Sequence, residues 1–170
     1  MQIEIQPQLD AIERWQELLA DPELARWSGK IETDRFGRIL MSPPPGFSHT
    51  RYAAAIIRLL NALLPDGQAT AETPINTADG VKVADAAWFS RVYWQELEPK
   101  DPPALERAPE ICIEVLSPSN SDKEMAEKRA LYLEAGAQEV WLCGLDGKIS
   151  FYTPELSERS TLCPQFPDHV

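Results

Sequence analysis

Hydrophobic and polar positions follow two different periods along this chain, and these periods predict strands in some segments and helices in others. The apolar run at 111–116, bounded by prolines, is typical of a buried strand. Ser121 and Glu124 have the spacing of a capping box, and Gly136 stands where a helix would end. We therefore expect a strand at 111–116 followed directly by a helix at about 122–135.

The other patterned segments predict a mixed sheet with helices on its faces. An amphipathic helical cover is expected at about 7–27, and a second helix, capped by Ser48, at 48–64. A short helix and an irregular connection account for 91–108. Further strands are expected at 30–33, 38–41, 68–76, 81–90, 139–145, 148–153 and 160–163. The predicted fold class is therefore α/β (α+β).

Size and composition fit a single domain that spans residues 1–170. The chain has 44% hydrophobic and 25% charged residues, which is ordinary for a globular protein. No apolar run approaches the length of a membrane span, and neither end resembles a signal peptide, so we expect a cytoplasmic protein without a membrane partner. The three cysteines are far apart and form no C-x-x-C pair, which indicates reduced core thiols.

The charge of the chain bears on its partners. A formal net charge of −11 argues against a general nucleic-acid binder, because phosphate contacts need Lys and Arg. The segment 26–58 differs, since it holds six basic residues against Glu32 and Asp34. This segment fits either a solvated face or a patch that faces phosphate.

Two acidic residues lie in the middle of predicted strands, where a charge is costly to bury. Glu114 interrupts the apolar run at 111–116, and Asp85 is the one charge within the apolar segment 83–89. A carboxylate in such a position needs a cation or a set of hydrogen-bond donors. The pair indicates a metal site, although buried acids can equally form an internal ion pair.

Lys128 lies on the inward face of the helix that follows Glu114. Met125, Lys128 and Tyr132 are separated by three and four residues, so they share one face of that helix. The strand and the helix would thus bring an acid and a base to the same place. They would either form a catalytic site or leave Asp85 and Glu114 as structural partners of the lysine.

Several segments, taken in order, resemble one protein family. They are M-S-P-P-P-G-F-S-H at 41–49, D-G-V-K-V-A-D-A-A-W-F-S at 79–90, E-V-L-S-P-S at 114–119, Lys128, G-A-Q-E-V-W-L at 136–142 and the strand at 147–154. Together they are similar to the Uma-type restriction endonuclease family, a branch of the PD-(D/E)xK nuclease superfamily. The similarity covers the chain from about residue 25 to its end, and it implies a restriction-endonuclease-like mixed central sheet flanked by helices.

The resemblance also implies a set of catalytic residues. Asp85 and Glu114 match the two acids that the family carries on its sheet. Lys128 matches the family's lysine, displaced from the E-x-K position onto the next helix. Glu32 and His49 match upstream positions and would be supporting groups.

A divalent cation is part of the chemistry that the resemblance implies. Asp85, Glu114 and the main-chain carbonyl of Val115 would hold Mg²⁺ (or Mn²⁺). The proline that the family usually has before the aspartate is Ala84 here, and a proline mainly stiffens the chain. This departure bears on how firmly Asp85 is held.

The function implied by this resemblance is that of a metal-dependent DNA endonuclease, which hydrolyses phosphodiester bonds. We expect it to act as a homodimer, so that two sites meet the two strands of DNA. One alternative is a catalytically inactive nuclease-fold module that binds a protein or nucleic-acid partner, which the acidic net charge supports. Another is a metal-dependent hydrolase acting on RNA or on a small phosphoester.

Overall fold

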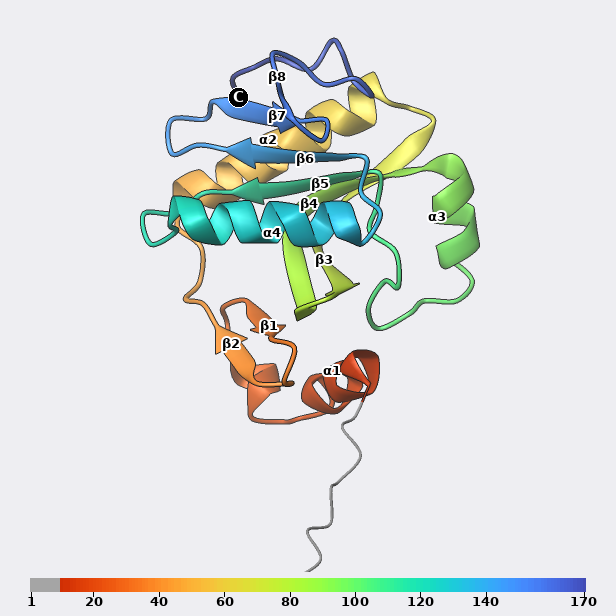
Figure 1. Ribbon diagram of the computed structural model, residues 1–170, viewed down its shortest axis with the longest axis vertical. Coiled ribbons are helices and arrows are strands. Elements are labelled where there is room, and N and C mark those ends of the chain that lie inside the picture. Colours follow the sequence, from red (N-terminus) through yellow and green to blue (C-terminus); the bar gives the residue numbers. More distant parts are fainter. Residues whose placement is uncertain (1–9) are drawn as a thin grey trace, which may run out of the picture.

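A six-stranded mixed sheet forms the centre of the computed structural model, which describes residues 10–170 (Figure 1). The strands lie side by side in chain order, and β5 and β6 are the parallel pair, whereas the other neighbours are antiparallel. The strands are β3 (Gly67–Thr77), β4 (Gly80–Ser90), β5 (Ile111–Val115), β6 (Glu139–Cys143), β7 (Ile149–Tyr152) and β8 (Leu156–Ser157).

Helices cover both faces of this sheet, which confirms the predicted fold class. Helix α4 lies across one face and α2 across the other (Figure 1). The helices are α1 (Ala11–Leu19), the 3₁₀ helix η1 (Leu24–Arg26), α2 (Phe47–Leu63), α3 (Arg91–Leu97) and α4 (Asp122–Glu134). Within residues 10–170, none of the helices combines the length and hydrophobicity that a membrane crossing requires.

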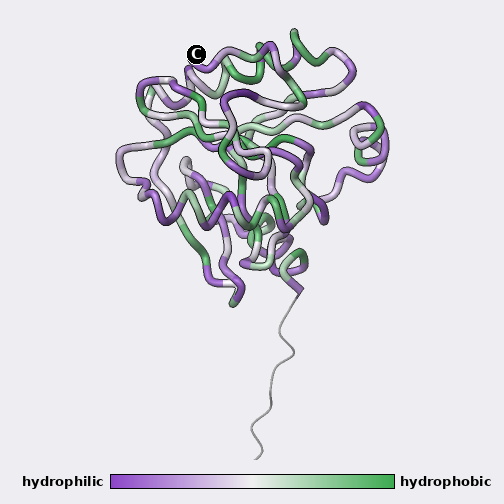
Figure 2. Tube along the Cα trace, turned by 45° about the horizontal axis from the view of Figure 1, so that its top comes forward, coloured by the Kyte–Doolittle hydropathy of each residue, from purple (hydrophilic) through white to green (hydrophobic). Residues whose placement is uncertain are grey.

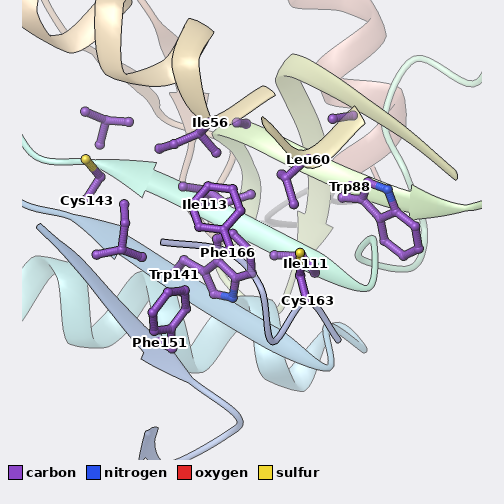
Figure 3. Packing of buried hydrophobic residues seen from close by; sticks show 14 of the residues in the cluster. Ile56, Leu60, Trp88, Ile111, Ile113, Trp141, Cys143, Phe151, Cys163 and Phe166 are labelled. Carbon is purple, nitrogen blue, oxygen red and sulfur yellow. The ribbon is translucent and has the colours of Figure 1, made fainter. Parts of the chain in front are cut away.

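Strand β5 shows how alternation along the chain directs side chains to one face or the other. Ile111, Ile113 and Val115 pack with residues of α2 in the largest hydrophobic cluster (Figure 3). Cys112 packs in the cluster on the side of α4. Glu114, with the same parity as Cys112, is therefore directed toward α4. Figure 2 shows hydrophobic positions (green) along much of the interior of the molecule and hydrophilic ones (purple) in many of its outer segments.

A small hairpin, β1 (Ile31–Thr33) and β2 (Ile39–Met41), packs against the first half of β4. Helix α1 covers the same region, because Trp15 and Leu18 pack against Val81 and Val83. The indole nitrogen of Trp15 also donates a hydrogen bond to the carbonyl of Pro103, at 2.9 Å. Helices α1 and η1 fall within the helical cover expected at about 7–27, whose residues 7–9 lie outside the described part of the chain.

Two predicted elements differ from the structure. The strand predicted at 160–163 is wrong: the last strand is β8, and Ser160 begins a turn instead. The turn forms because the buried carboxylate of Glu139 accepts hydrogen bonds from the Ser160 hydroxyl and from the amides of Thr161 and Leu162, at 2.7–2.8 Å. Helix α2 begins at Phe47 with Gly46 as its N-cap, so the predicted Ser48 cap lies inside the first turn.

Candidate active site

A pocket of about 630 Å³ lies between the β1–β2 hairpin with its following proline loop and the loop that leads into α4. It brings together residues from β1, α2, β4, β5 and α4, which are far apart in the sequence. All six residues singled out from the sequence line this pocket, namely Glu32, His49, Asp85, Glu114, Val115 and Lys128.

Asp85 is a buried carboxylate, 2% exposed, with donors on both of its oxygens. Its Oδ2 accepts a hydrogen bond from the amide of Val115 at 2.7 Å and lies 3.1 Å from Nε2 of His49. Its Oδ1 contacts the ammonium group of Lys30. Burial alone would raise the pKa of Asp85, but the hydrogen bond to His49 and the charge of Lys30 hold it below its usual range.

Glu114 is equally buried, at 3% exposure, and faces α4 as the alternation of β5 requires. The hydroxyl of Tyr132 donates to its Oε1 at 2.6 Å, and Nζ of Lys128 lies 3.4 Å from both carboxylate oxygens. Burial raises the pKa of the Glu114 carboxyl to about 7, although the charges of Lys128 and Lys30 act to lower it.

Lys128 joins three elements through its ammonium group. Besides Glu114, it contacts Oε1 of Glu32 at 2.8 Å, and the same oxygen accepts a hydrogen bond from the amide of Val83 at 2.8 Å. Helix α4 directs Lys128 inward together with Met125, and both are buried. Burial would lower the pKa of Lys128, but the charges of Glu114 and Glu32 raise it, so the side chain carries its proton at neutral pH.

Lys30 belongs to this cluster, and sequence reasoning did not single it out as a site residue. Its Nζ donates to the carbonyl of Val83 at 2.9 Å, contacts Asp85 and lies 3.9 Å from Oε2 of Glu114. A signal was present in the sequence, because Lys30 precedes Glu32 by two residues and an extended chain directs alternate side chains to the same side. Tyr132 was predicted only as a packed residue, although its hydroxyl also bonds Glu114.

Glu72 is a further acid at the rim of the pocket, and it has an unusual backbone conformation. Its φ is 47°, in the left-handed region, in the middle of β3. The pairing of β3 with β4 is interrupted at this residue, since Ala71 pairs with Ala86 and Thr73 with Ala84. The register is the same on both sides of this gap, so no residue is inserted and Glu72 lies opposite Asp85. Partial burial raises the pKa of Glu72.

The basic residues of segment 26–58 do not form one patch around the pocket. Of the six, Lys30 is the one that lines it. Arg35 and Arg38 instead form ion pairs with Asp79 and Asp34, at 2.9 and 2.6 Å. Most of the positive charge in this segment thus lies away from the buried acids.

The oxygen atoms of the pocket are of the type that binds a divalent cation. Within residues 10–170, no three His, Cys, Asp or Glu side chains gather closely enough to hold a metal ion by themselves. Asp85 and Glu114 nevertheless contact one ammonium group, and Val115 lines the same pocket. Two carboxylates, a main-chain carbonyl and water are the hard oxygen ligands that Mg²⁺ prefers. The residues fit such an ion by their chemistry, with Lys30 lying between the two carboxylates.

Comparisons with known proteins agree with this fold. The chain resembles the crystal structure of a protein described as "a putative nuclease belonging to DUF820" from Anabaena variabilis ATCC 29413. The TM-score is 0.64 and the sequence identity 20%, and the alignment covers 90% of this chain and 80% of the other, which shows a shared fold. No curated protein matches the sequence. The family described as "Uma2: Putative restriction endonuclease" matches residues 14–168. Since this match spans nearly the whole chain, and as the sequence motifs led us to expect, the chain belongs to the Uma2 family.

Proposed function

We propose that this protein is a metal-dependent endonuclease that hydrolyses phosphodiester bonds in DNA. The observation that supports the proposal is the convergence of Asp85, Glu114 and Lys128 on one polar pocket of a Uma2 family member. Burying acids and a lysine in a core costs free energy, because the charges lose their contact with water. These are also the groups that phosphodiester hydrolysis uses.

Asp85, Glu114 and the carbonyl of Val115 would hold Mg²⁺ or Mn²⁺ in this proposal. When bound, such an ion polarises a phosphoryl oxygen and lowers the pKa of water. Asp85 suits a ligand role because it stays ionised through the physiological pH range. Glu114 is held in place by the hydroxyl of Tyr132, which fixes the direction of its Oε1.

Lys128 would supply positive charge to the scissile phosphate. Its ammonium group has three protons, which either stabilise charge that develops on the phosphate oxygens or orient the attacking water. Glu32 acts as a positioning residue, because it contacts Lys128 and is itself held by the amide of Val83. His49 positions Asp85 in the same way, through Oδ2.

The test combines metal binding with strand cleavage. We expect wild-type protein to bind Mn²⁺ in calorimetry and to nick supercoiled plasmid, whereas Asp85→Asn should lose both activities. Lys128→Met should retain metal binding and lose nicking. Asp66→Asn is the matched control, because Asp66 is an exposed acid whose carboxylate pairs with Arg91 outside the pocket. Nicking that persists in Asp85→Asn would show that another group carries the reaction.

A second candidate function is a catalytically inactive nuclease-fold module that binds a protein or nucleic-acid partner. The observation that favours it is the pairing of charges in the pocket. The carboxylates of Asp85, Glu32 and Glu114 each already have a lysine partner within the protein. Such buried ion pairs occur in proteins without catalytic roles. Absence of both Mn²⁺ binding and nicking in the wild type would favour this module.

We also propose that the protein acts as a homodimer, because cutting duplex DNA requires a site for each strand. The support is a set of exposed apolar side chains in β2, at the edge of its hairpin, and at the start of α2, on either side of the proline loop that lines the pocket. Leu40 and Met41 on this edge are 44% and 48% exposed, and Phe47 at the start of α2 is 82% exposed. Light scattering on the purified protein should give twice the 19.1 kDa mass of one chain.

A further inference from the structure

Lys30 forms ion pairs with both of the carboxylates proposed to hold the metal. Its Nζ contacts Oδ1 of Asp85, lies 3.9 Å from Oε2 of Glu114 and donates to the carbonyl of Val83 at 2.9 Å. The side chain is 16% exposed, so little water competes for its protons. Three oxygen acceptors from two strands thus surround one ammonium group.

These oxygen contacts are of the kind that a hard divalent cation would make. Oδ1 is the oxygen of Asp85 that Lys30 contacts, because Oδ2 is engaged by Val115 and His49. Asp85 and Glu114 would thus have to hold a divalent cation with carboxylate groups that Lys30 already contacts. Two cations at contact distance in a buried site repel each other strongly.

The charge balance of the cluster also favours metal binding in exchange for the Lys30 ammonium group. Asp85, Glu114 and Glu32 bring three acidic groups, and Lys30 and Lys128 bring two positive charges. Lys128 pairs with Glu32 and Glu114 and does not contact Asp85. Among these five groups alone, a divalent ion added to both lysines would leave an excess of one positive charge, whereas exchange of the ion for the Lys30 ammonium group would leave none.

From this geometry we propose that Lys30 is an internal competitor for the divalent cation: its ammonium group neutralises Asp85 and Glu114, and metal binding displaces it from Asp85. This inference rests on the proposed function, because it presumes that the two acids bind a metal. A competitor of this kind reduces the apparent metal affinity by the fraction of molecules in which it has left the site. Lys30 would thus set the metal concentration at which the enzyme becomes active.

The test measures Mn²⁺ affinity by calorimetry in wild type, Lys30→Met and Lys82→Met. Lys82 is the matched control, since it is a second buried lysine that joins β4 to the hairpin through the carbonyl of Thr33 and also contacts the carboxylate of Asp79 in the β3–β4 turn. It does not line the pocket. We expect Lys30→Met to bind Mn²⁺ at least about tenfold more tightly than wild type, and Lys82→Met to bind it as wild type does.

Two results would overturn the inference. If wild type and Lys30→Met bind Mn²⁺ with equal affinity, or if Lys30→Met binds it more weakly, Lys30 does not compete, and the proposed metal site survives. If neither protein binds Mn²⁺, the inference and the proposed metal site fail together. Circular dichroism and thermal unfolding of each variant would verify that it is folded.

A measurement on the unaltered protein makes the test independent of whether Lys30→Met folds. The Cε and Nζ signals of the lysines can be followed by NMR as Mg²⁺ is added to wild type. Displacement predicts that the Lys30 signal shifts at saturating Mg²⁺, while the Lys82 signal stays in place. A Lys30 signal that does not move while Mg²⁺ binds would overturn the inference.

Discussion

At the scale of single residues, Asp85 and Glu114 show how two carboxylates in one pocket acquire different properties. Both are buried, but Asp85 accepts a hydrogen bond from a main-chain amide and contacts both a lysine and a histidine. Glu114 accepts a hydrogen bond from the hydroxyl of Tyr132 at 2.6 Å, while the ammonium groups of Lys128 and Lys30 lie 3.4 and 3.9 Å from its oxygens. Asp85 therefore stays ionised, whereas burial dominates the pKa of Glu114.

The raised pKa of Glu114 predicts a pH dependence of stability. Its carboxyl has a pKa of about 7 in the native state and 4.5 as a reference, so between these values the native state binds more protons than the unfolded state. The contribution of Glu114 to stability is therefore present below pH 4.5 and is lost as the pH rises to about 7. Urea unfolding from pH 5 to 8 should show a loss on the order of 2 to 3 kcal/mol from this group.

Glu114→Gln is the matching variant, because glutamine resembles the protonated carboxyl and does not titrate. Its unfolding free energy should decline less over this pH range than that of wild type. Asp85 acts in the opposite sense, since its lowered pKa removes stability only as the pH falls below 3.8. Parallel curves for wild type and Glu114→Gln between pH 5 and 8 would contradict the assignment.

At the scale of elements, helix α4 holds Lys128 and Tyr132, which contact Glu114. Ser121 caps this helix, as its hydroxyl accepts a hydrogen bond from the amide of Glu124 at 3.2 Å. We predict that Ser121→Ala lowers the unfolding free energy by about 1 kcal/mol, because an amide of the first turn loses its partner. Urea denaturation measures this loss. Ser119→Ala is the control, since the one hydrogen bond of the Ser119 hydroxyl within residues 10–170 joins it to the hydroxyl of Ser117. An equal loss in both variants would contradict the cap.

Local periodicity explains why much of the fold could be predicted from the sequence. The strand at 111–116 and the helix at 122–135 differ by one residue from β5 and α4. The same two periods directed Glu114 and Lys128 toward each other, and the two side chains are in contact. Alternation and helical spacing are properties of neighbouring residues, so a single sequence contains them.

The parts that could not be predicted depend on contacts between distant segments. Lys30 contacts Asp85, which is 55 residues away in the sequence. Local alternation relates Lys30 to Glu32 but not to Asp85. The segment 160–163 has the composition of a strand. It forms a turn instead, because its hydroxyl and amide groups donate hydrogen bonds to the carboxylate of Glu139, about twenty residues away. In both cases a buried charge selected the conformation, and local propensity did not.

At the scale of the whole molecule, charge opposes the proposed DNA substrate. The chain has a formal net charge of −11, and acids also outnumber lysines around the pocket. The acidic lining residues are Glu32, Glu72, Asp85, Glu114 and Glu124, against Lys30 and Lys128. Attraction of phosphate to positive side chains supplies most non-specific DNA affinity, so this surface lacks the usual source of binding.

Divalent cations should therefore control DNA binding as well as cleavage. A divalent cation held by Asp85 and Glu114 would reduce the negative charge of the pocket and so its repulsion of phosphate, and Ca²⁺ takes the same oxygen ligands as Mg²⁺. We predict that fluorescence anisotropy with a labelled DNA duplex, at about 0.1 M salt, shows at least about tenfold tighter binding in Ca²⁺ than in EDTA. Asp85→Asn should bind equally weakly in both. Equal affinity of wild type in Ca²⁺ and EDTA would mean that DNA meets a surface away from the acids, because no cation would then be needed to offset them.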